Sequence, residues 1–390
     1  MKLNPYKNLF LLNEGVIFLN HGSFGACPRP VFEAYQTWQR KLESQPVQFF
    51  RQDYPEYDRH ARQVLANELH ANPDDLVFMP NATYGVNVVA HSLSDHPGSP
   101  LRPGDEILTT DHEYGACNHA WEYACRKTGA KYIYQPIPFP VTSEQEVLER
   151  FWQGVTSRTR VIYLSHITSP TALRLPVEDI CQRARQAGIL TVIDGAHAPG
   201  QICVDLTAIG ADFYTGNCHK WMMAPKGSAF LYARPDVQPL IEPLVVGWGW
   251  NPDTSKVQGS KYYSYLQWTG TKDPAAALSV PVAIQFAHEH NWESVRRQCH
   301  NLLRQTIQRL FDLSGLPPLY PLDSAFYRQM GIAPLPAGVN LDALRARLYA
   351  DFHIEIPIIE WNEQAFLRIS VQGYNSPEDL DALVEAMKTL

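Results

Sequence analysis

The spacing of apolar and polar residues alternates between two periods along the middle of the chain. Seven short apolar runs, rich in β-branched and aromatic residues, predict strands. They lie at 76–79, 106–109, 131–135, 160–165, 189–194, 211–215 and 228–233. Apolar residues at helical spacing between these runs predict helices at 56–71, 84–93, 116–128, 144–153 and 176–187. Strands that alternate with helices predict an α/β fold whose sheet is largely parallel and buried on both faces.

The pattern changes near residues 274–281, where we place a domain boundary. From this point on, two long amphipathic helices, a proline-rich stretch, a helix, two strands and a closing helix are predicted. They lie at 275–290, 292–312, 316–336, 340–351, 353–359, 365–371 and 377–389. This mixture is typical of a smaller α+β domain. We therefore expect a large domain over 21–278 and a small C-terminal domain over 279–390.

The composition excludes several classes of protein. A chain of 390 residues, of which 45% are hydrophobic, can bury a large core and is not expected to be disordered. The net charge of −7 gives no reason to expect nucleic acid or an anionic membrane as a partner. The first ten residues lack the apolar core of a signal peptide, and no apolar stretch reaches the ~18 residues of a membrane span. Seven cysteines without a CxxC pair indicate free thiols in a reducing cytoplasm.

Two strand ends carry the residues with the clearest chemistry. The apolar run at 189–194 ends in Asp194, and Lys220 follows the run at 211–215, between His219 and Trp221. Ligands of open α/β sheets bind beyond the carboxyl ends of the strands. A lysine among apolar and aromatic groups favours the free amine. Taken singly, Asp194 is equally compatible with a turn cap, and Lys220 with a lysine whose amine reaches solvent.

The two residues together indicate a particular cofactor. A carboxylate that keeps a pyridine nitrogen protonated and a lysine that carries an aldehyde are the protein's roles toward pyridoxal phosphate. Motifs in matching order support this: FLNHGSFG (18–25), NATYGVN (81–87), DGAHAPG (194–200), GNCHKWMMAPKG (216–227), WTGTKD (268–273) and LRISVQGYN (367–375). With them the chain resembles the pyridoxal-phosphate enzymes of fold type I, in the class V aminotransferase superfamily, and within it the isopenicillin N epimerase-like branch.

The resemblance implies a fold and an assembly. It implies a large domain with a mainly parallel seven-stranded sheet and a smaller α+β C-terminal domain, with residues 1–20 packing against the small domain. It also implies a homodimer in which Thr271 reaches the phosphate site of the partner subunit.

The resemblance also implies roles for individual residues. Lys220 would carry the cofactor as a Schiff base and move the proton at Cα, Asp194 would hold the pyridinium nitrogen, and His197 would bind the ring hydroxyl oxygen. Tyr114 would stack on the ring. The phosphate and the cofactor would be held by Ala82, Thr83, Asn217 and His219. Arg368 would bind the substrate carboxylate. Further contacts to the substrate would come from Asn20, Gly22 and Ser23.

Structural roles are the alternatives for these residues. His197 could be a buried histidine, Tyr114 part of the core, Thr83 a helix cap and Arg368 an exposed strand residue, while 20–23 could form a tight turn. The chain has no phosphate-binding P-loop, no GxGxxG and no HExxH motif. A metal site from His112, Cys117 and His119 would be loosely spaced, so we expect no metal.

One departure from the superfamily bears on the reaction. Cysteine desulfurases carry a nucleophilic cysteine shortly before the carboxylate-binding arginine, whereas residues 353–364 contain none. We therefore do not expect a persulfide-carrying desulfurase. The resemblance implies an enzyme acting at Cα or Cβ of an amino acid, nominally an epimerase or racemase. A C–S lyase or an aminotransferase is the alternative, and a non-catalytic protein that binds the cofactor or a partner is the alternative from another class.

Overall fold

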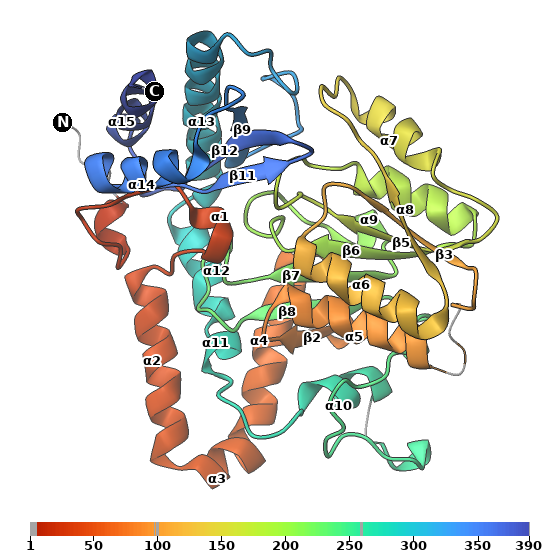
Figure 1. The fold of residues 1–390 in the computed structure, drawn as a ribbon. Coiled ribbons are helices and arrows are strands. Elements are labelled where there is room, and N and C mark those ends of the chain that lie inside the picture. Colours follow the sequence, from red (N-terminus) through yellow and green to blue (C-terminus); the bar gives the residue numbers. More distant parts are fainter. Residues whose placement is uncertain (1–5, 97, 99–100, 258–259, 390) are drawn as a thin grey trace.

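A computed structural model describes residues 6–96, 98, 101–257 and 260–389 of the chain (Figure 1). Its centre is a seven-stranded sheet in the order β2–β8–β7–β6–β5–β3–β4. The strands are β2 (Leu76–Met79), β3 (Glu106–Thr110), β4 (Lys131–Gln135), β5 (Thr159–Ser165), β6 (Leu190–Gly195), β7 (Phe213–Asn217) and β8 (Ala229–Ala233). Only β8 runs antiparallel to its neighbours. The predicted α/β fold with a largely parallel sheet is confirmed.

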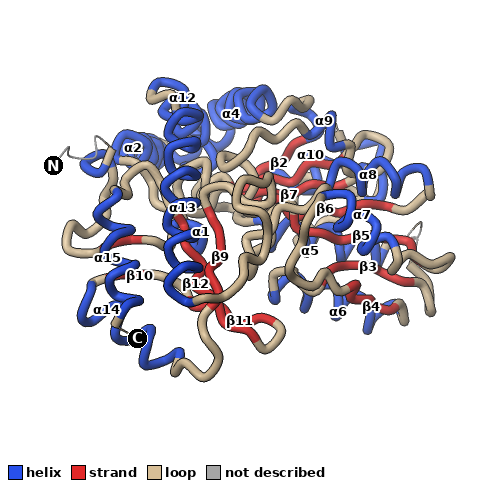
Figure 2. Tube along the Cα trace, turned by 90° about the horizontal axis from the view of Figure 1, so that it is seen from above, coloured by secondary structure: helices blue, strands red, loops and turns tan. Residues whose placement is uncertain are grey.

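Helices cover both faces of this sheet, as the view from above shows (Figure 2). Helices α5 (Ala82–Asp95) and α6 (Gly115–Thr128) lie on one face, and α7 (Glu144–Trp152), α8 (Val177–Gln186) and α9 (Leu206–Ile209) on the other. Successive residues of one strand therefore enter different cores. In β5, Val161 and Tyr163 join the core beneath α5 and α6, whereas Ile162 and Leu164 join the core beneath α8. This burial on both faces explains the unbroken apolar runs in the sequence.

The segment before the sheet is helical, which was not predicted between residues 29 and 53. The short helix α1 (His21–Phe24) precedes α2 (Arg29–Ser44), which leads through α3 (Pro46–Gln48) to α4 (Tyr54–Glu68). The helix predicted at 275–290 is divided into α11 (Ala275–Leu278) and α12 (Val280–Glu289). Pro281 explains the division, because it has no amide hydrogen to continue the helical ladder.

The C-terminal elements form a second, smaller layer beside the large sheet (Figure 2). They comprise α13 (Trp292–Ser314), α14 (Leu341–Phe352), α15 (Pro377–Lys388) and an antiparallel sheet β11–β12–β9, with β9 (Met330–Pro334), β11 (Ile358–Trp361) and β12 (Gln364–Ser370). Strand β9 lies within the proline-rich stretch at 316–336 and was not predicted as a strand. The strand predicted at 353–359 is two strands, β10 (Ile354–Glu355) and β11, separated at Pro357.

The N-terminal segment is joined to these C-terminal elements. Strand β1 (Ile17–Phe18) pairs in parallel with β10, and the Asn375 side chain donates a hydrogen bond to the Phe18 carbonyl at 3.0 Å. This pairing fits the expected packing of residues 1–20 on the small domain, and the domain limits themselves stay a prediction. None of the described helices combines the length and the apolar character needed to cross a bilayer.

Candidate active site

A cavity of about 570 Å³ opens beyond the carboxyl ends of β5, β6 and β7. Most of the residues singled out from the sequence line it: Ser23, Ala82, Thr83, Tyr114, Asp194, His197, Asn217, His219 and Lys220. Strands β6 and β7 are adjacent and parallel, with Asp194 paired to Thr215. Asp194 and the residues that follow β7 therefore reach the same edge of the sheet, as predicted.

Lys220 lies in this cavity without a carboxylate partner among the described residues. Its Nζ is 3.1 Å from Nε2 of His197. Burial, with a further contribution from the positive charge of Arg368, lowers the pKa of Lys220 to about 8. The neutral amine is therefore accessible near physiological pH, as a covalent nucleophile requires.

The Asp194 carboxylate is buried and forms no ion pair within the described part of the chain. It accepts a hydrogen bond from the Ala196 amide at 2.8 Å, and the Tyr163 hydroxyl and Cys117 Sγ lie 3.3 Å and 3.6 Å from its Oδ2. Burial raises the pKa of Asp194 above its ordinary value, although the Ala196 hydrogen bond and Lys220 oppose the shift. A buried carboxylate of this kind is suited to a cationic partner that enters the cavity.

His197 is held between the lysine and an indole. Trp221 Nε1 donates to His197 Nδ1 at 3.3 Å, on the opposite side of the ring from Lys220 Nζ. Burial lowers the pKa of His197 well below its ordinary value, so the ring is neutral. A neutral ring whose Nδ1 accepts from Trp221 carries its proton on Nε2, which faces the Lys220 amine.

The turn before α5 forms the other end of the cavity. Asn81 caps the helix by accepting from the Tyr84 amide at 2.8 Å, and Asn217 Oδ1 accepts from the Ala82 amide at 2.8 Å. Gly85 allows α5 to lie directly on β7, because a Cβ there would fall 2.3 Å from Thr215 Oγ1. The amino end of a fourteen-residue helix therefore faces the cavity, where it favours an anion.

Arg368 lies beside the cavity and not in its lining. Its guanidinium donates to the Ser169 carbonyl at 2.6 Å and to Ser23 Oγ at 3.0 Å, while its buried Nε has no partner among the described residues. Ser23 in turn donates to Asn20 Oδ1 at 2.5 Å. Arg368 is thus a buried cation at the cavity wall and not the exposed strand residue that was the alternative.

Three other predicted residues lie outside the cavity lining. The Gly22 amide donates to Ser370 Oγ at 3.2 Å, and Asn20 contacts Ser23 as described. Thr271 is exposed and does not face the cavity of its own chain. The three residues weighed as a metal site have separate partners, since His112 contacts Thr171, Cys117 contacts Asp194 and His119 contacts Glu122.

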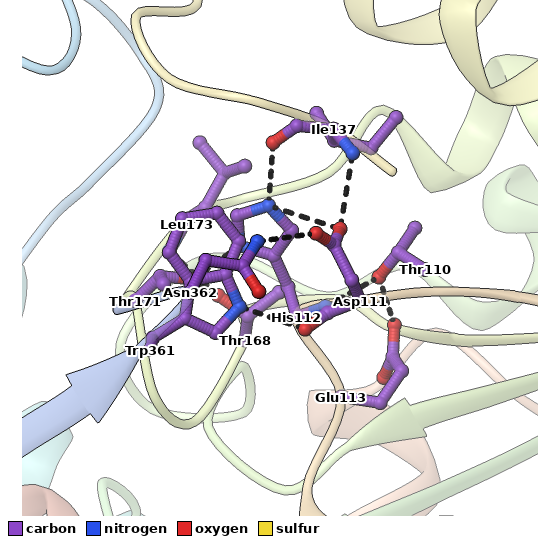
Figure 3. Close-up of polar contacts among 10 residues, drawn as sticks. All are labelled: Thr110, Asp111, His112, Glu113, Ile137, Thr168, Thr171, Leu173, Trp361 and Asn362. Carbon is purple, nitrogen blue, oxygen red and sulfur yellow. Dashed lines mark hydrogen bonds and ion pairs between the residues drawn. The ribbon is translucent and has the colours of Figure 1, made fainter. Parts of the chain in front are cut away.

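The segment after β3 contributes Tyr114 and a buried carboxyl group. Tyr114 is 46% exposed and lines the cavity. Glu113, immediately before it, accepts from Thr110 Oγ1 at 2.7 Å and from the Ser165 amide at 2.8 Å (Figure 3 shows the Thr110 contact). Burial raises the pKa of Glu113 to about 7.

Sequence reasoning missed several residues of the site. Ser165 and Lys226 line the cavity, and Ser165 ends a predicted strand, so its place at the sheet edge was available as a signal. His21 Nε2 lies 3.0 Å from the Lys220 carbonyl oxygen and steadies that backbone. The Glu113 carboxyl group is buried against Ser165, more than fifty positions away in the sequence, so the residues around Glu113 do not indicate its burial.

Comparison with known proteins identifies the family. Residues 18–324 match the family model described as Aminotransferase class-V. The chain belongs to this family. It is 35% identical over 387 residues to isopenicillin N epimerase of Amycolatopsis lactamdurans, covering 97% of this chain and 96% of that protein. It is 30% identical to putative L-cysteine desulfhydrase 1 of Oryza sativa subsp. japonica, covering 96% and 83% of the two chains.

A solved structure shows the same fold. The apo structure of cysteine desulfurase from Thermococcus onnurineus NA1 superposes with a TM-score of 0.83 at 21% identity, covering 100% of this chain and 98% of that one. The fold type I architecture implied by the resemblance is thereby confirmed. As a member of the class V aminotransferase family, the chain is an enzyme that depends on pyridoxal 5′-phosphate.

The residues at the cavity fit this cofactor. A half-buried lysine without a carboxylate partner suits its aldehyde, and a buried carboxylate without an ion pair suits its protonated ring nitrogen. The amino end of α5, with Thr83 and His219 beside it, suits its phosphate. Lys220, Asp194 and this turn would therefore hold the cofactor.

Proposed function

We propose that this enzyme moves the Cα proton of an α-amino acid, as an epimerase or racemase does. The observation that carries the proposal is the half-buried Lys220 amine, which is bonded to His197 and has no carboxylate partner among the described residues, in the cavity that Asp194 also lines. The identity to isopenicillin N epimerase over nearly the whole chain supports the same reaction class.

Each of these side chains has a task in such a reaction. When bound, pyridoxal phosphate withdraws electrons from Cα of the substrate. Asp194 keeps the ring nitrogen protonated, and Arg368 binds the substrate carboxylate with its guanidinium fork. The Lys220 amine takes the proton from Cα, with His197 beside it. In an epimerisation, a proton returns to the opposite face of Cα.

A C–S lyase is the second candidate function. A relative named putative L-cysteine desulfhydrase 1 is 30% identical, and loss of the Cα proton to Lys220 is the first step that a lyase also needs. The Cβ–S bond then breaks and the sulfur leaves with the electron pair. None of the residues lining the cavity is a cysteine, which favours these two reactions over a persulfide-carrying desulfurase.

We also propose a homodimer in a reducing cytoplasm. Thr271 is exposed and does not line the cavity of its own chain, which suits a residue that completes the phosphate site of a partner subunit. All seven cysteines are unpaired, as expected in a reducing compartment.

A panel of L-amino acids incubated with the holoenzyme distinguishes the reactions. Accumulation of the D-amino acid, or of an epimer at Cα, supports the proposal. Pyruvate with sulfide assigns the lyase, and a keto acid that appears only with a second amino acceptor assigns a transaminase. Exchange of the Cα hydrogen with deuterium from solvent, measured by NMR, is expected for the true substrate. Its absence for every amino acid tested would contradict the proposal.

A further inference from the structure

The hairpin of β11 and β12 reaches across to the segment that carries Tyr114. Its two turn residues, Asn362 and Glu363, have φ of 46° and 63°, the conformation of a tight two-residue hairpin turn. Trp361 and Asn362 form what we call the hairpin tip. The tip lies against Asp111 and His112, which follow β3 about 250 residues earlier in the chain (Figure 3).

Two hydrogen bonds and one ring contact fix the hairpin tip to this segment. Trp361 Nε1 donates to the Asp111 carbonyl oxygen at 2.7 Å, and Asn362 Nδ2 donates to Asp111 Oδ2 at 2.8 Å. The Trp361 ring lies over the His112 ring with 4.2 Å between centroids. The other oxygen of Asp111 accepts from the Ile137 amide at 3.0 Å, so both sides of the carboxylate are bonded.

His112 anchors the same segment from the opposite direction. The ring is fully buried, and its two nitrogens lie 2.7 Å from Thr171 Oγ1 and 2.7 Å from the Ile137 carbonyl oxygen. The Trp361 ring covers the outward face of this histidine. Residues 111 and 112 are therefore held between the large sheet and the hairpin tip (Figure 3).

The segment held in this way carries two groups of the active site. Glu113 is bonded to Thr110 and Ser165, whereas the Tyr114 side chain makes no hydrogen bond within the described part of the chain. Tyr114 is placed by its backbone alone, since it lies between the anchored residues and the start of α6. Asp111 and His112, together with the contacts of Glu113, therefore set the backbone from which the Tyr114 ring projects into the cavity.

The same hairpin carries the carboxylate-binding arginine. Arg368 lies on β12, its amide donates to the Pro357 carbonyl at 3.1 Å, and Leu367 is paired with Ile358 of β11. The guanidinium and the hairpin tip are thus two parts of one paired unit. Backbone pairing between β11 and β12 joins these two parts.

We propose that the β11–β12 hairpin links recognition of the substrate carboxylate to the placement of the cofactor-stacking ring, with Trp361 and Asn362 as positioning residues for Tyr114. The carboxylate half of this statement rests on the proposed function of Arg368. The half that concerns Tyr114 requires only that the chain binds pyridoxal phosphate.

The test compares small changes at the hairpin tip. Trp361→Phe keeps a ring over His112 and removes the donor to Asp111, and Asn362→Gly keeps the turn and removes the amide. Glu363→Asn is the matched control, because Glu363 is the other turn residue, is exposed and has a positive φ that asparagine accepts. Each apoprotein is titrated with pyridoxal phosphate, and the visible circular dichroism of the bound cofactor and the apoprotein melting temperature are recorded.

We expect both tip variants to bind pyridoxal phosphate roughly three- to tenfold more weakly, the range that a lost aromatic contact gives. The cofactor dichroism should change, and Glu363→Asn should match wild type. The apoprotein should melt within about 4 °C of wild type, because each tip variant loses about one hydrogen bond. In a Tyr114→Ala background, Trp361→Phe should have no further effect, because both changes remove the same contact.

Wild-type affinity and dichroism in both tip variants would overturn the proposal, and so would an undiminished effect of Trp361→Phe in the Tyr114→Ala background. The effect of the hairpin tip on substrate binding is measured separately, as the KM of the holoenzyme. This KM should be higher for Trp361→Phe than for wild type. If the tip variants lose cofactor affinity while no amino acid reacts with wild type, the proposed reaction fails and the positioning role of the hairpin stands.

Discussion

Replacing Asp194 with asparagine separates the chemical role of the carboxylate from its structural role. Asparagine has nearly the same shape, and its oxygen can still accept from the Ala196 amide. Its new amide hydrogens would face the Tyr163 hydroxyl and Cys117 Sγ, both of which can accept. The Tyr163 hydroxyl and the Cys117 thiol, which donate to Asp194 Oδ2, would lose this acceptor and could only accept in return, whereas the apoprotein would no longer bury a carboxylate without an ion pair.

The expected magnitudes differ between stability and rate. The free energy of unfolding of the apoprotein should change by less than about 2 kcal/mol, since the loss of the acceptor for Tyr163 and Cys117 opposes the gain from removing a buried charge. Turnover should fall about 10²–10³-fold, equivalent to about 2.7–4 kcal/mol, the typical cost of removing one preorganised electrostatic partner. The affinity for pyridoxal phosphate should also fall, because the ion pair to the ring nitrogen is lost.

The assay measures kcat for the reaction that the amino-acid panel reveals, alongside urea unfolding of the apoprotein. Asp212→Asn is the matched control. Asp212 is also a buried carboxylate, but it precedes β7, at the opposite edge of the sheet, and binds the Thr191 amide at 2.7 Å and Arg234. This control should lose about 1–3 kcal/mol of stability and keep its kcat. Turnover of Asp194→Asn within a few-fold of wild type would show that Asp194 only caps a turn.

Three further outcomes follow from the geometry of the site. The pKa of Lys220 is lowered to about 8 in the folded apoprotein, from 10.5 for an ordinary lysine. Below pH 8 the folded protein therefore holds an unfavourable charged lysine, which lowers the free energy of unfolding. This destabilisation is lost as the pH rises from 8 to 10.5, where the folded protein releases the proton before the unfolded chain does. Urea unfolding should show Lys220→Met more stable than wild type at pH 7, with a smaller difference at pH 10. Arg368→Lys should raise KM about 10–100-fold with a smaller effect on kcat, because one ammonium cannot replace the guanidinium fork. Thr271→Val should weaken cofactor binding without changing apoprotein stability, and light scattering should give a dimer; a monomer with full cofactor occupancy would contradict the shared site.

Six of the seven central strands could be predicted because they are buried on both faces and so read as unbroken apolar runs, whereas the edge strand β4 contains no buried residue and was predicted from its aromatic and β-branched residues. The placement of Asp194 and Lys220 at one sheet edge followed from the same pattern, since adjacent parallel strands end together. Helix α2 was not predicted, although Val31, Trp38 and Leu42 stand at helical spacing in its sequence, and of its sixteen residues only Val31 is fully buried. Strand β9 lies in a proline-rich region and forms through its pairing with β12, which is a tertiary effect.

The remaining parts of the site depend on contacts between distant segments. Glu113 is bonded to Ser165, and the Asp111 segment is held by Trp361; these partners are 52 and 250 positions apart in the sequence. Local periodicity carries no information on such pairs. The same holds for Arg368, whose guanidinium is placed by Ser23 and Ser169 from two other parts of the chain.

Covalent trapping of the cofactor tests the central claim most directly. Borohydride reduction of the holoenzyme, followed by proteolysis and mass spectrometry, locates the lysine that carries pyridoxal phosphate. Three lysines compete, because burial lowers the pKa of Lys220, Lys226 and Lys272 alike. The account predicts a single modified peptide with the phosphopyridoxyl group on Lys220, and modification of Lys226 or Lys272 in its place would contradict it.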